Sequence, residues 1–387
     1  MTLIAMVLGL VAVLLFGGFV TDIKHGLQSE FVRRTGHLQV QQKDYFRLGS
    51  GNPTAYGIAN YERIIAAIQQ DPVLAPMLAV LTPTLQFGGI AGNFSAGVSR
   101  TVFVHGVVVD DQNRMRSWND YQMRVLSQNL SLSGSAPDAA VIGTGVARVL
   151  ELCTALKVPD CEAADAAPVP EEAATPGADL PADIASLSVP KAPAANGGST
   201  GGQQRIELLA GNARGAPNVA TVNVMRAEFQ GMKELDDVYV GLHLSQAQKL
   251  IFGSRPPQVT AIVLQLQHTS QIPTARARLD DILKTTLKDE PLTVFDYEEL
   301  NPYYGQALSM FGSIFGFISV LIGGIVLFTV TNTMSMAVVE RTVEIGTLRA
   351  IGLRKQGIKS MFVTEGVVLG CFGAVLGIGA AIGCAWI

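Results

Sequence analysis

Few residues in this sequence have the spacing that a catalytic or metal site requires. The sequence contains no G-x-x-x-x-G-K-[ST] phosphate loop. Gly143-Thr144-Gly145 lacks the third glycine of a dinucleotide-binding fingerprint and predicts only a tight strand-to-helix turn. The five histidines have no ligand or triad spacing, and adjacent acidic residues such as Asp110-Asp111 usually point apart. We therefore predict no catalytic residue, no metal site and a chain that is not an enzyme.

The four cysteines form two pairs without CxxC spacing. Cys153 and Cys161 lie in the polar middle of the chain, whereas Cys371 and Cys384 lie in its last apolar stretch. Cys153 and Cys161 are close enough in sequence to form a disulfide if the middle of the chain lies in an oxidising compartment. Two unpaired cysteines are the alternative.

The segment from Glu340 to Gly352 has the most distinctive pattern in the chain. It combines E-R-x-x-E-I-G with R-A-I-G and follows an N-x-M motif. Apolar residues at every third position predict a short amphipathic helix, with Arg349 on another face: Ile345, Leu348 and Ile351. Such a helix suits docking onto a cytoplasmic protein, and the alternative is a charged loop that only fixes membrane topology. The combined pattern is more specific than topology requires.

Three uncharged or nearly uncharged stretches flank this segment and the polar middle. Residues 1–21, 300–339 and 361–387 are apolar over lengths that can cross a bilayer, so we predict three transmembrane helices. A signal peptide at the start would need a basic leader and a cleavage site, which this sequence lacks. Glu365 is interpreted as an interfacial carboxylate. Glycines in the third stretch indicate either close helix packing or ordinary enrichment: Gly366, Gly370, Gly373 and Gly377.

Charge sets the orientation of these spans. Residues 340–360 form a short basic loop, and such loops stay in the cytoplasm. Residues 22–299 are then extracytoplasmic, the third span ends outside, and we expect a fourth span in a longer parent chain. The formal net charge of -4 excludes the basic excess that nucleic-acid binding requires.

The polar middle has the pattern of a folded α/β domain. His37 to Gln41 alternates like a half-buried strand, and Thr101 to Val109 is rich in β-branched residues. A helix is expected to end at Asp71-Pro72, and a strand-helix-strand unit is expected from Thr260 to Phe295. Residues 162–204, rich in Ala, Pro, Gly and Ser, predict a flexible insertion that either engages a partner or is simply tolerated. The predicted fold class is therefore an α+β membrane protein with a large α/β extracytoplasmic domain.

On these motifs the chain resembles the FtsX-like permease family, the type VII ABC transporters that include MacB-type exporters and the lipoprotein-releasing LolC and LolE permeases. The resemblance is strongest from Leu300 to Ile387. Weaker matches to a MacB-like periplasmic core lie at Gly36 to Val40, Ala140 to Ala147 and Leu244 to Leu250.

This resemblance implies a complex of two permeases, identical or different, with two cytoplasmic ATPases in a bacterial inner membrane. ATP and Mg would be bound by the ATPases and no cofactor by this chain. The implied contacts with the ATPase are Glu340, Arg341, Glu344, Ile345, Gly346, Leu348, Arg349, Ala350, Ile351 and Gly352. The expected activity is mechanotransmission that releases lipoprotein or other hydrophobic cargo, with a periplasmic carrier or adaptor as a candidate partner. The alternatives are MacB-like efflux of drugs or toxins, an FtsX-like scaffold that activates a cell-wall hydrolase, and a membrane sensor without an ATPase.

Overall fold

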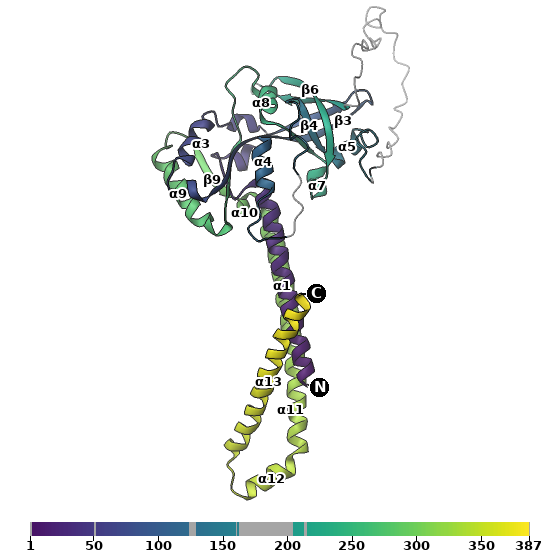
Figure 1. Cartoon of the computed structure of the whole chain (residues 1–387), viewed down its shortest axis with the longest axis vertical. Helices are drawn as coiled ribbons and strands as arrows, with labels where there is room; N and C mark the ends of the chain where they lie inside the picture. The colour runs from purple at the N-terminus through teal and green to yellow at the C-terminus, as the bar shows by residue number, and fades with distance from the viewer. Residues whose placement is uncertain are drawn as a thin grey trace, which may run out of the picture. The chain divides into compact units, whose positions relative to one another are not determined.

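The computed structural model describes residues 2–49, 52–123, 129–159, 161, 204–212 and 215–386 (Figure 1). The chain divides into two compact units, which are described separately. One comprises Met1–Phe31 with Glu298–Ile387, and the other comprises Val32–Tyr297. The predicted insertion at 162–204 lies outside the described residues, except Gln204, which begins a strand.

The first unit is built from long apolar helices. Its helices are α1 (Thr2–Thr35), α11 (Pro302–Glu340), α12 (Thr342–Ala350) and α13 (Lys355–Ala385), and α10 (Tyr297–Leu300) lies at its border. Among the described residues, α1, α11 and α13 are long and apolar enough to cross a membrane. Three long apolar helices are what the sequence predicts. Helix α1 continues past the expected end of its span at residue 21 and reaches Thr35, and several of its later residues are buried, Val32 and Arg33 among them.

Small residues and aromatic rings bring these helices together. A Cβ on Gly9 would lie 2.6 Å from Val326 Cγ2 of α11, so the α1 backbone approaches α11 closely there. About two helical turns further along α1, Phe16 stacks on Phe315 of α11 with ring centroids 5.8 Å apart. Phe31 meets Tyr304 edge to face at 5.6 Å. The contacts between α1 and α11 therefore extend along most of the apolar part of α1.

The second unit is a mixed sheet covered by short helices. Its strands are β1 (Leu38–Gln42), β2 (Leu78–Asn93), β3 (Val98–Val107), β4 (Ala139–Gly143), β5 (Gln204–Gly211), β6 (Pro217–Glu228), β7 (Tyr239–His243), β8 (Ala261–Leu266) and β9 (Leu292–Asp296). The α-helices are α2 (Tyr45–Leu48), α3 (Tyr61–Gln69), α4 (Val109–Arg116), α5 (Thr144–Val149), α7 (Lys233–Asp236), α8 (Leu244–Phe252) and α9 (Ile272–Thr285). Three short 3-10 helices complete it: η2 (Pro53–Tyr56), η3 (Ala75–Met77) and η4 (Thr269–Gln271).

The strand order is β3-β7-β4-β6-β5-β2-β8-β1-β9, and β2 also pairs with β3. That extra pairing closes six strands into a ring. The first part of β2, Leu78 to Thr84, pairs with β8, whereas its second part, Leu85 to Asn93, pairs with β3. Figure 1 shows α3, α9 and β9 at one end of the unit, and β3, β4, β6 and α5 at the other. One strand therefore serves both parts of the sheet.

Several local predictions for this unit are confirmed. Helix α3 ends at Gln69, with only the cap residue Gln70 before Asp71-Pro72, and the predicted strand-helix-strand unit is β8, α9 and β9. The expected half-burial of the strand at His37 to Gln41 is wrong. Leu38 through Gln41 are all buried, because β1 pairs with β8 on one edge and with β9 on the other and both its faces are covered.

The turn predicted at Gly143-Thr144-Gly145 is also confirmed, since β4 ends at Gly143 and α5 begins at Thr144. The buried carboxylate of Asp236 accepts hydrogen bonds from the Thr144 and Gly145 amides, each at 2.9 Å. It also binds the Thr144 hydroxyl. Asp236 thereby satisfies amide groups that the start of a helix leaves without an intrahelical partner. The glycines are needed because a Cβ at Gly143 would collide with the Asp236 backbone.

Candidate functional site: the segment between α11 and α13

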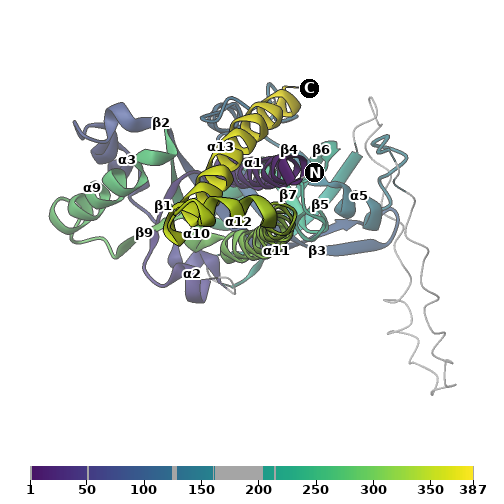
Figure 2. The same cartoon turned by 90° about the horizontal axis from the view of Figure 1, so that it is seen from below.

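The distinctive sequence pattern from Glu340 to Gly352 forms the connection between two long helices of the first unit. Helix α11 ends at Glu340, and Arg341, with φ -93° and ψ 16°, leaves the helical conformation. Helix α12 then begins at Thr342. Figure 2 shows α12 crossing from α11 to α13. The short helix that the sequence predicts is therefore present.

The end of α12 explains the glycine of the R-A-I-G motif. The Gly352 amide donates to the Arg349 carbonyl at 3.1 Å, and the Leu353 amide donates to the Leu348 carbonyl at 3.0 Å. These two bonds define a Schellman motif, which requires a residue with positive φ directly after the helix cap. Gly352 has φ +101°. The motif thus ends α12 sharply and turns the chain toward α13.

The apolar residues of this segment do not share one face. Ile345 and Leu348 are half-buried, whereas Ile351 is 85% exposed and Val343 is 80% exposed. Residues three apart drift by about 60° per step around a helix, so a repeat of three moves off a face, while a repeat of four stays close to it. The exposed apolar face of α12 is therefore formed by Val343, Thr347 and Ile351. The sequence interpretation missed Val343 because it followed a spacing of three residues.

The charges of this segment surround the exposed face. Glu340 and Glu344 are exposed, and so are the five basic residues of the loop: Arg341, Arg349, Arg354, Lys355 and Lys359. Of the remaining predicted contact residues, Gly346 and Ala350 are also exposed. Exposed apolar side chains among exposed charges of both signs have the composition of a surface that can contact another protein.

One side chain of the segment is tied to a neighbouring helix. Arg341 Nη1 lies 3.6 Å from Glu365 Oε2 of α13. Sequence reasoning interpreted Glu365 as an interfacial carboxylate and did not pair it with Arg341. Only the folded helices bring the two residues together, so no local sequence signal could have identified the pair.

The glycines of the third span differ in their surroundings. A Cβ on Gly373 would lie 3.3 Å from Met6 Cβ, and one on Gly377 would lie 2.8 Å from Leu10 Cδ2, so both face α1. Gly366 faces Met334 Cε of α11 at 3.5 Å, whereas no described atom lies within 4 Å of a Cβ on Gly370. Gly373 and Gly377 therefore allow α1 and α13 to approach closely within one chain.

The last turn of α1 is held inside the second unit. Arg33 Nε donates to the Trp118 carbonyl at 2.6 Å, and Gln265 Nε2 donates to the Val32 carbonyl at 3.3 Å. Carbonyl groups at a helix end have no intrahelical partner, so a buried end requires such donors. Val32 and Arg33 are buried, and the end of α1 is therefore part of the domain core.

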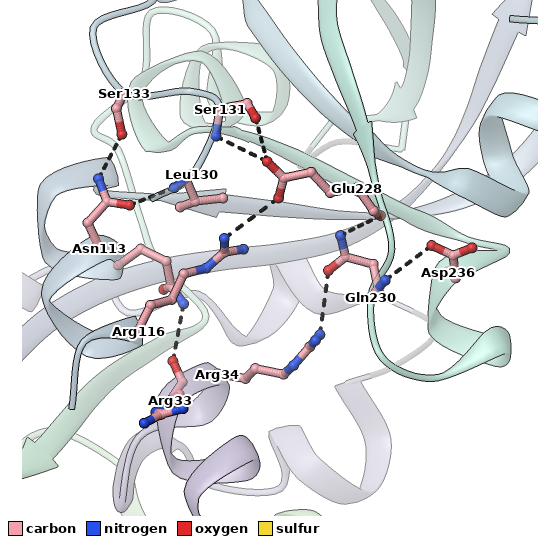
Figure 3. Close-up of polar contacts among 11 residues, drawn as sticks. Arg33, Arg34, Asn113, Arg116, Leu130, Ser131, Ser133, Glu228, Gln230 and Asp236 are labelled. Atoms are coloured by element: carbon pink, nitrogen blue, oxygen red, sulfur yellow. Dashed lines mark hydrogen bonds and ion pairs between the residues drawn. The ribbon is translucent and has the colours of Figure 1, made fainter. Parts of the chain in front are cut away.

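Polar contacts continue from this helix end toward β6 (Figure 3). Arg34 Nη1 donates to Gln230 Oε1 at 3.5 Å, and the Gln230 amide donates to Asp236 Oδ1 at 3.2 Å. Nearby, Arg116 of α4 pairs with Glu228 of β6 at 3.6 Å. The residues are far apart in sequence, and the sequence interpretation did not identify this junction.

The cysteines and the residue types that bind metals are the remaining candidates from the sequence. Cys153 and Cys161 are joined by a disulfide with their Cα atoms 5.6 Å apart, while Cys371 and Cys384 are free and exposed. Across the described part of the chain, no three His, Cys, Asp or Glu side chains come together in a way that could hold a metal ion.

Comparisons with known proteins give a family match for the C-terminal part of the chain and relatives among transport proteins. Residues 314–387 match the model of the FtsX-like permease C-terminal family. The macrolide export ATP-binding/permease protein MacB of Brucella abortus is 30% identical over 175 residues, which cover 43% of this chain and 26% of that protein. The uncharacterized ABC transporter permease YvrN of Bacillus subtilis is 33% identical over 144 residues, which cover 35% of this chain and 34% of YvrN.

Among solved structures, the periplasmic region of MacB from Actinobacillus actinomycetemcomitans aligns with 70% of this chain and 94% of its own length, at 10% identity and a TM-score of 0.35. The sequence alignments cover only about a quarter of the Brucella MacB protein and about a third of YvrN. The α12 segment lies within the region that the family model matches. The C-terminal part of the chain, residues 314–387, therefore matches the FtsX-like permease family, and the chain has homologues among MacB-type ABC transporter permeases.

Proposed function

We propose that this chain is the permease subunit of an ABC transporter and that α12 is the helix on which a separate cytoplasmic ATPase docks. The observation that carries the proposal is the exposed apolar face of α12 at Val343 and Ile351. Exposed β-branched side chains bordered by positive charge favour a protein partner over open solvent. The segment also lies in the region that matches the permease family.

The ATPase partner supplies the nucleotide chemistry in this proposal. The sequence has no phosphate-binding loop, so ATP and Mg would be bound by the partner. One relative is named an ATP-binding/permease protein and another is named a permease. A permease and its ATPase can therefore belong to one chain or to two. We propose two ATPases on a pair of permeases, identical or different.

The orientation follows from charge. The basic residues around α12 favour the cytoplasmic side, which puts the α/β unit on the other side of a bacterial inner membrane, in the periplasm. The disulfide between Cys153 and Cys161 agrees with an oxidising compartment.

Mechanical transmission is the mode of action that these features support. Helix α1 is continuous from Thr2 to Thr35, and its last turn is held by Trp118 and Gln265 of the α/β unit. Because α1 begins in the first unit and ends in the second, it is the element that we propose carries a movement in the membrane to the domain. We propose that ATP-driven movement of α12 is passed through the membrane helices in this way.

Docking can be tested by copurification of the ATPase with the full chain in detergent. The double variant Val343→Ser, Ile351→Ser should reduce the amount of recovered ATPase at least tenfold, because it removes both large apolar side chains from the exposed face. Val219→Ser is the control, since Val219 is also an exposed valine but lies on β6 of the other unit. Unchanged ATPase recovery in the α12 double variant would rule out docking on this face.

Coupling needs a second measurement, because a docked ATPase can still be idle. Changing Glu344 and Arg349 together to Ala should leave the protein inserted in the membrane and lower cargo-stimulated ATP hydrolysis. Full stimulation in this double variant would count against α12 as the coupling element.

For the cargo, we propose a lipoprotein or another hydrophobic molecule that leaves the outer leaflet and passes to a periplasmic carrier or adaptor. MacB-like efflux is the second candidate, and the name of the Brucella relative, a macrolide export protein, favours it. Mass spectrometry of the purified complex and an ATPase assay together distinguish the two candidates. Copurified acylated protein supports the first candidate, whereas stimulation of ATPase activity by macrolides alone supports the second. Recovery of a cell-wall hydrolase without any cargo-stimulated activity would instead indicate an FtsX-like scaffold.

A further inference from the structure

The ion pair between Arg341 and Glu365 connects the start of α12 with a residue in the interior of α13. Arg341 is the single non-helical residue between α11 and α12. Its guanidinium lies 3.6 Å from the Glu365 carboxylate, and the two side chains are 48% and 38% exposed in the isolated chain. Because Arg341 stands at the start of α12, the pair fixes the end of α12 that is far from the turn at Gly352.

Glu365 occupies an unusual position for a carboxylate. It lies ten residues into α13, about 15 Å along the helix from Lys355. It contributes to a pocket of about 340 Å³ whose other lining residues are Leu3, Thr364, Val368, Leu369 and Phe372. Carboxylates in such apolar surroundings are costly unless they are paired, so the cation at Arg341 has a strong reason to stay beside Glu365.

The two ends of α12 are then held in different ways. At its C-terminal end, the Schellman turn at Gly352 leads the backbone directly into α13. At its N-terminal end, the Arg341 side chain forms an ion pair with Glu365 of α13. Without the pair, the non-helical backbone at Arg341 and the glycine turn would act as two hinges. With the pair, α12 is connected to α13 at both of its ends.

We propose that Glu365 is a positioning residue that holds α12 at a fixed angle on α13 through Arg341. This inference deepens the proposed function, because a docking helix transmits a displacement only if it does not swing freely. The alternative is that the pair only lowers the cost of inserting Glu365 into the membrane. In that case, neutralising Glu365 would remove the cost and leave the angle of α12 unchanged.

The test measures the angle of α12 directly and does not depend on an ATPase. Spin labels are placed at Thr347 on α12 and at Gln356 on α13, both exposed, in the full chain with Cys371 and Cys384 replaced by Ala. Distances between the labels are measured by pulsed electron resonance in lipid nanodiscs. The variants are Glu365→Gln, Arg341→Gln and the exchange Arg341→Glu with Glu365→Arg. Lys359→Gln is the control, since it removes an exposed charge from the same end of α13.

We expect each neutral variant to widen the distance distribution at least twofold, and the exchanged pair to restore a narrow distribution. Lys359→Gln should match the parent protein. Parent-like distributions in both neutral variants would overturn the proposal, and so would an exchanged pair as broad as the single variants. A separate failure of ATPase copurification, with the label distances as expected, would overturn the proposed docking function and leave the positioning role intact.

Discussion

Arg278 of α9 donates two hydrogen bonds to the same carboxylate oxygen of Asp71, from Nη2 at 2.7 Å and from Nε at 2.9 Å. The other oxygen of Asp71 accepts from the amides of Val73 and Leu74 at 3.0 and 2.9 Å. One side chain thereby holds the turn after α3 and ties it to α9. The Arg278 hydrogen bonds keep the pKa of Asp71 below its ordinary value.

The first prediction concerns this pair. Asp71→Ala should lower the free energy of unfolding of the α/β unit by about 2 kcal/mol, because the amides of a buried turn lose their acceptor and Arg278 keeps only its bond to Asp281. Asp71→Asn should cost less, since its amide oxygen can still accept from the turn. Denaturant unfolding of the full chain, followed by tryptophan fluorescence, measures both. The exposed pair Arg47–Asp44 is the control, and Asp44→Ala should cost less than about 0.5 kcal/mol.

A second prediction concerns pH. Burial lowers the pKa of His37 to about 4, and Asp120 opposes that shift. Burial, with a smaller contribution from Arg34, also lowers the pKa of His105 to about 4. Between pH 6.5 and about 4 the unfolded chain therefore binds more protons than the folded chain, and the free energy of unfolding should fall as the pH drops through this window.

The slope has an upper limit of about 1.4 kcal/mol per pH unit for each histidine. Unfolding curves at pH 7, 6 and 5 measure it. His105→Gln should remove part of the slope, because glutamine does not titrate in this range. An unchanged slope in that variant would show that His105 is accessible to protons in the folded protein.

A third prediction tests the packing of the membrane helices. Gly377→Val should separate α13 from α1, since even a Cβ would meet Leu10 Cδ2 at 2.8 Å. The expected cost is about 1–3 kcal/mol, measured as a lower thermal midpoint in detergent. Gly370→Val is the matched control on the same helix, because no described atom lies within 4 Å of its Cβ position. Equal losses in the two variants would contradict the assigned contact.

A fourth prediction separates the two glycines of the α12 segment. Gly352→Ala should cost about 1–2 kcal/mol, because φ +101° is strained for any residue with a Cβ. Gly346→Ala should instead stabilise α12 by up to about 1 kcal/mol, since alanine is the better helix former and nothing described obstructs its Cβ. Hydrogen exchange at the Gly352 and Leu353 amides reports both effects. It should become faster in the first variant and not in the second.

A fifth prediction concerns the segment between the disulfide and β5. Its composition lacks aromatic residues, so we expect that replacing residues 162–203 by a short Gly-Ser linker leaves the α/β unit folded. Cys161 and Gln204 are retained because they belong to the disulfide and to β5. Limited proteolysis of the full chain checks the result. Rapid digestion of the shortened protein would show that the segment contributes to the fold.

Local signals in the sequence were enough for much of the architecture. Alternating residues from Thr260 to Leu266 predicted β8, and Pro273 correctly indicated the start of α9. The long apolar stretches correctly indicated three helices that can span a membrane. In each case the information lies within one element, where hydrophobic periodicity or proline chemistry acts over a few residues.

The rest depends on contacts between distant residues. Gln39 and Gln41 have the polarity of an exposed strand face, yet both are buried. Gln39 Nε2 reaches the Thr35 carbonyl at 2.8 Å, and Gln41 Nε2 reaches Gln39 Oε1 at 2.9 Å, so local hydrogen bonds replace the water that the pattern implied. In the candidate site, Glu365 needed a partner from another helix before it could be interpreted. A single sequence does not contain that pairing.

Strand β2 has a practical consequence for dissection of the protein. Its first part belongs to the row with β8, β1 and β9, and its second part helps to close the six-stranded ring. A truncation between Thr84 and Leu85 would leave strands with unpaired backbone N–H and C=O groups on both fragments, and such exposed edges promote aggregation. Neither part of the sheet is complete without β2. Chimaeras with a relative should therefore exchange the whole unit from Val32 to Tyr297.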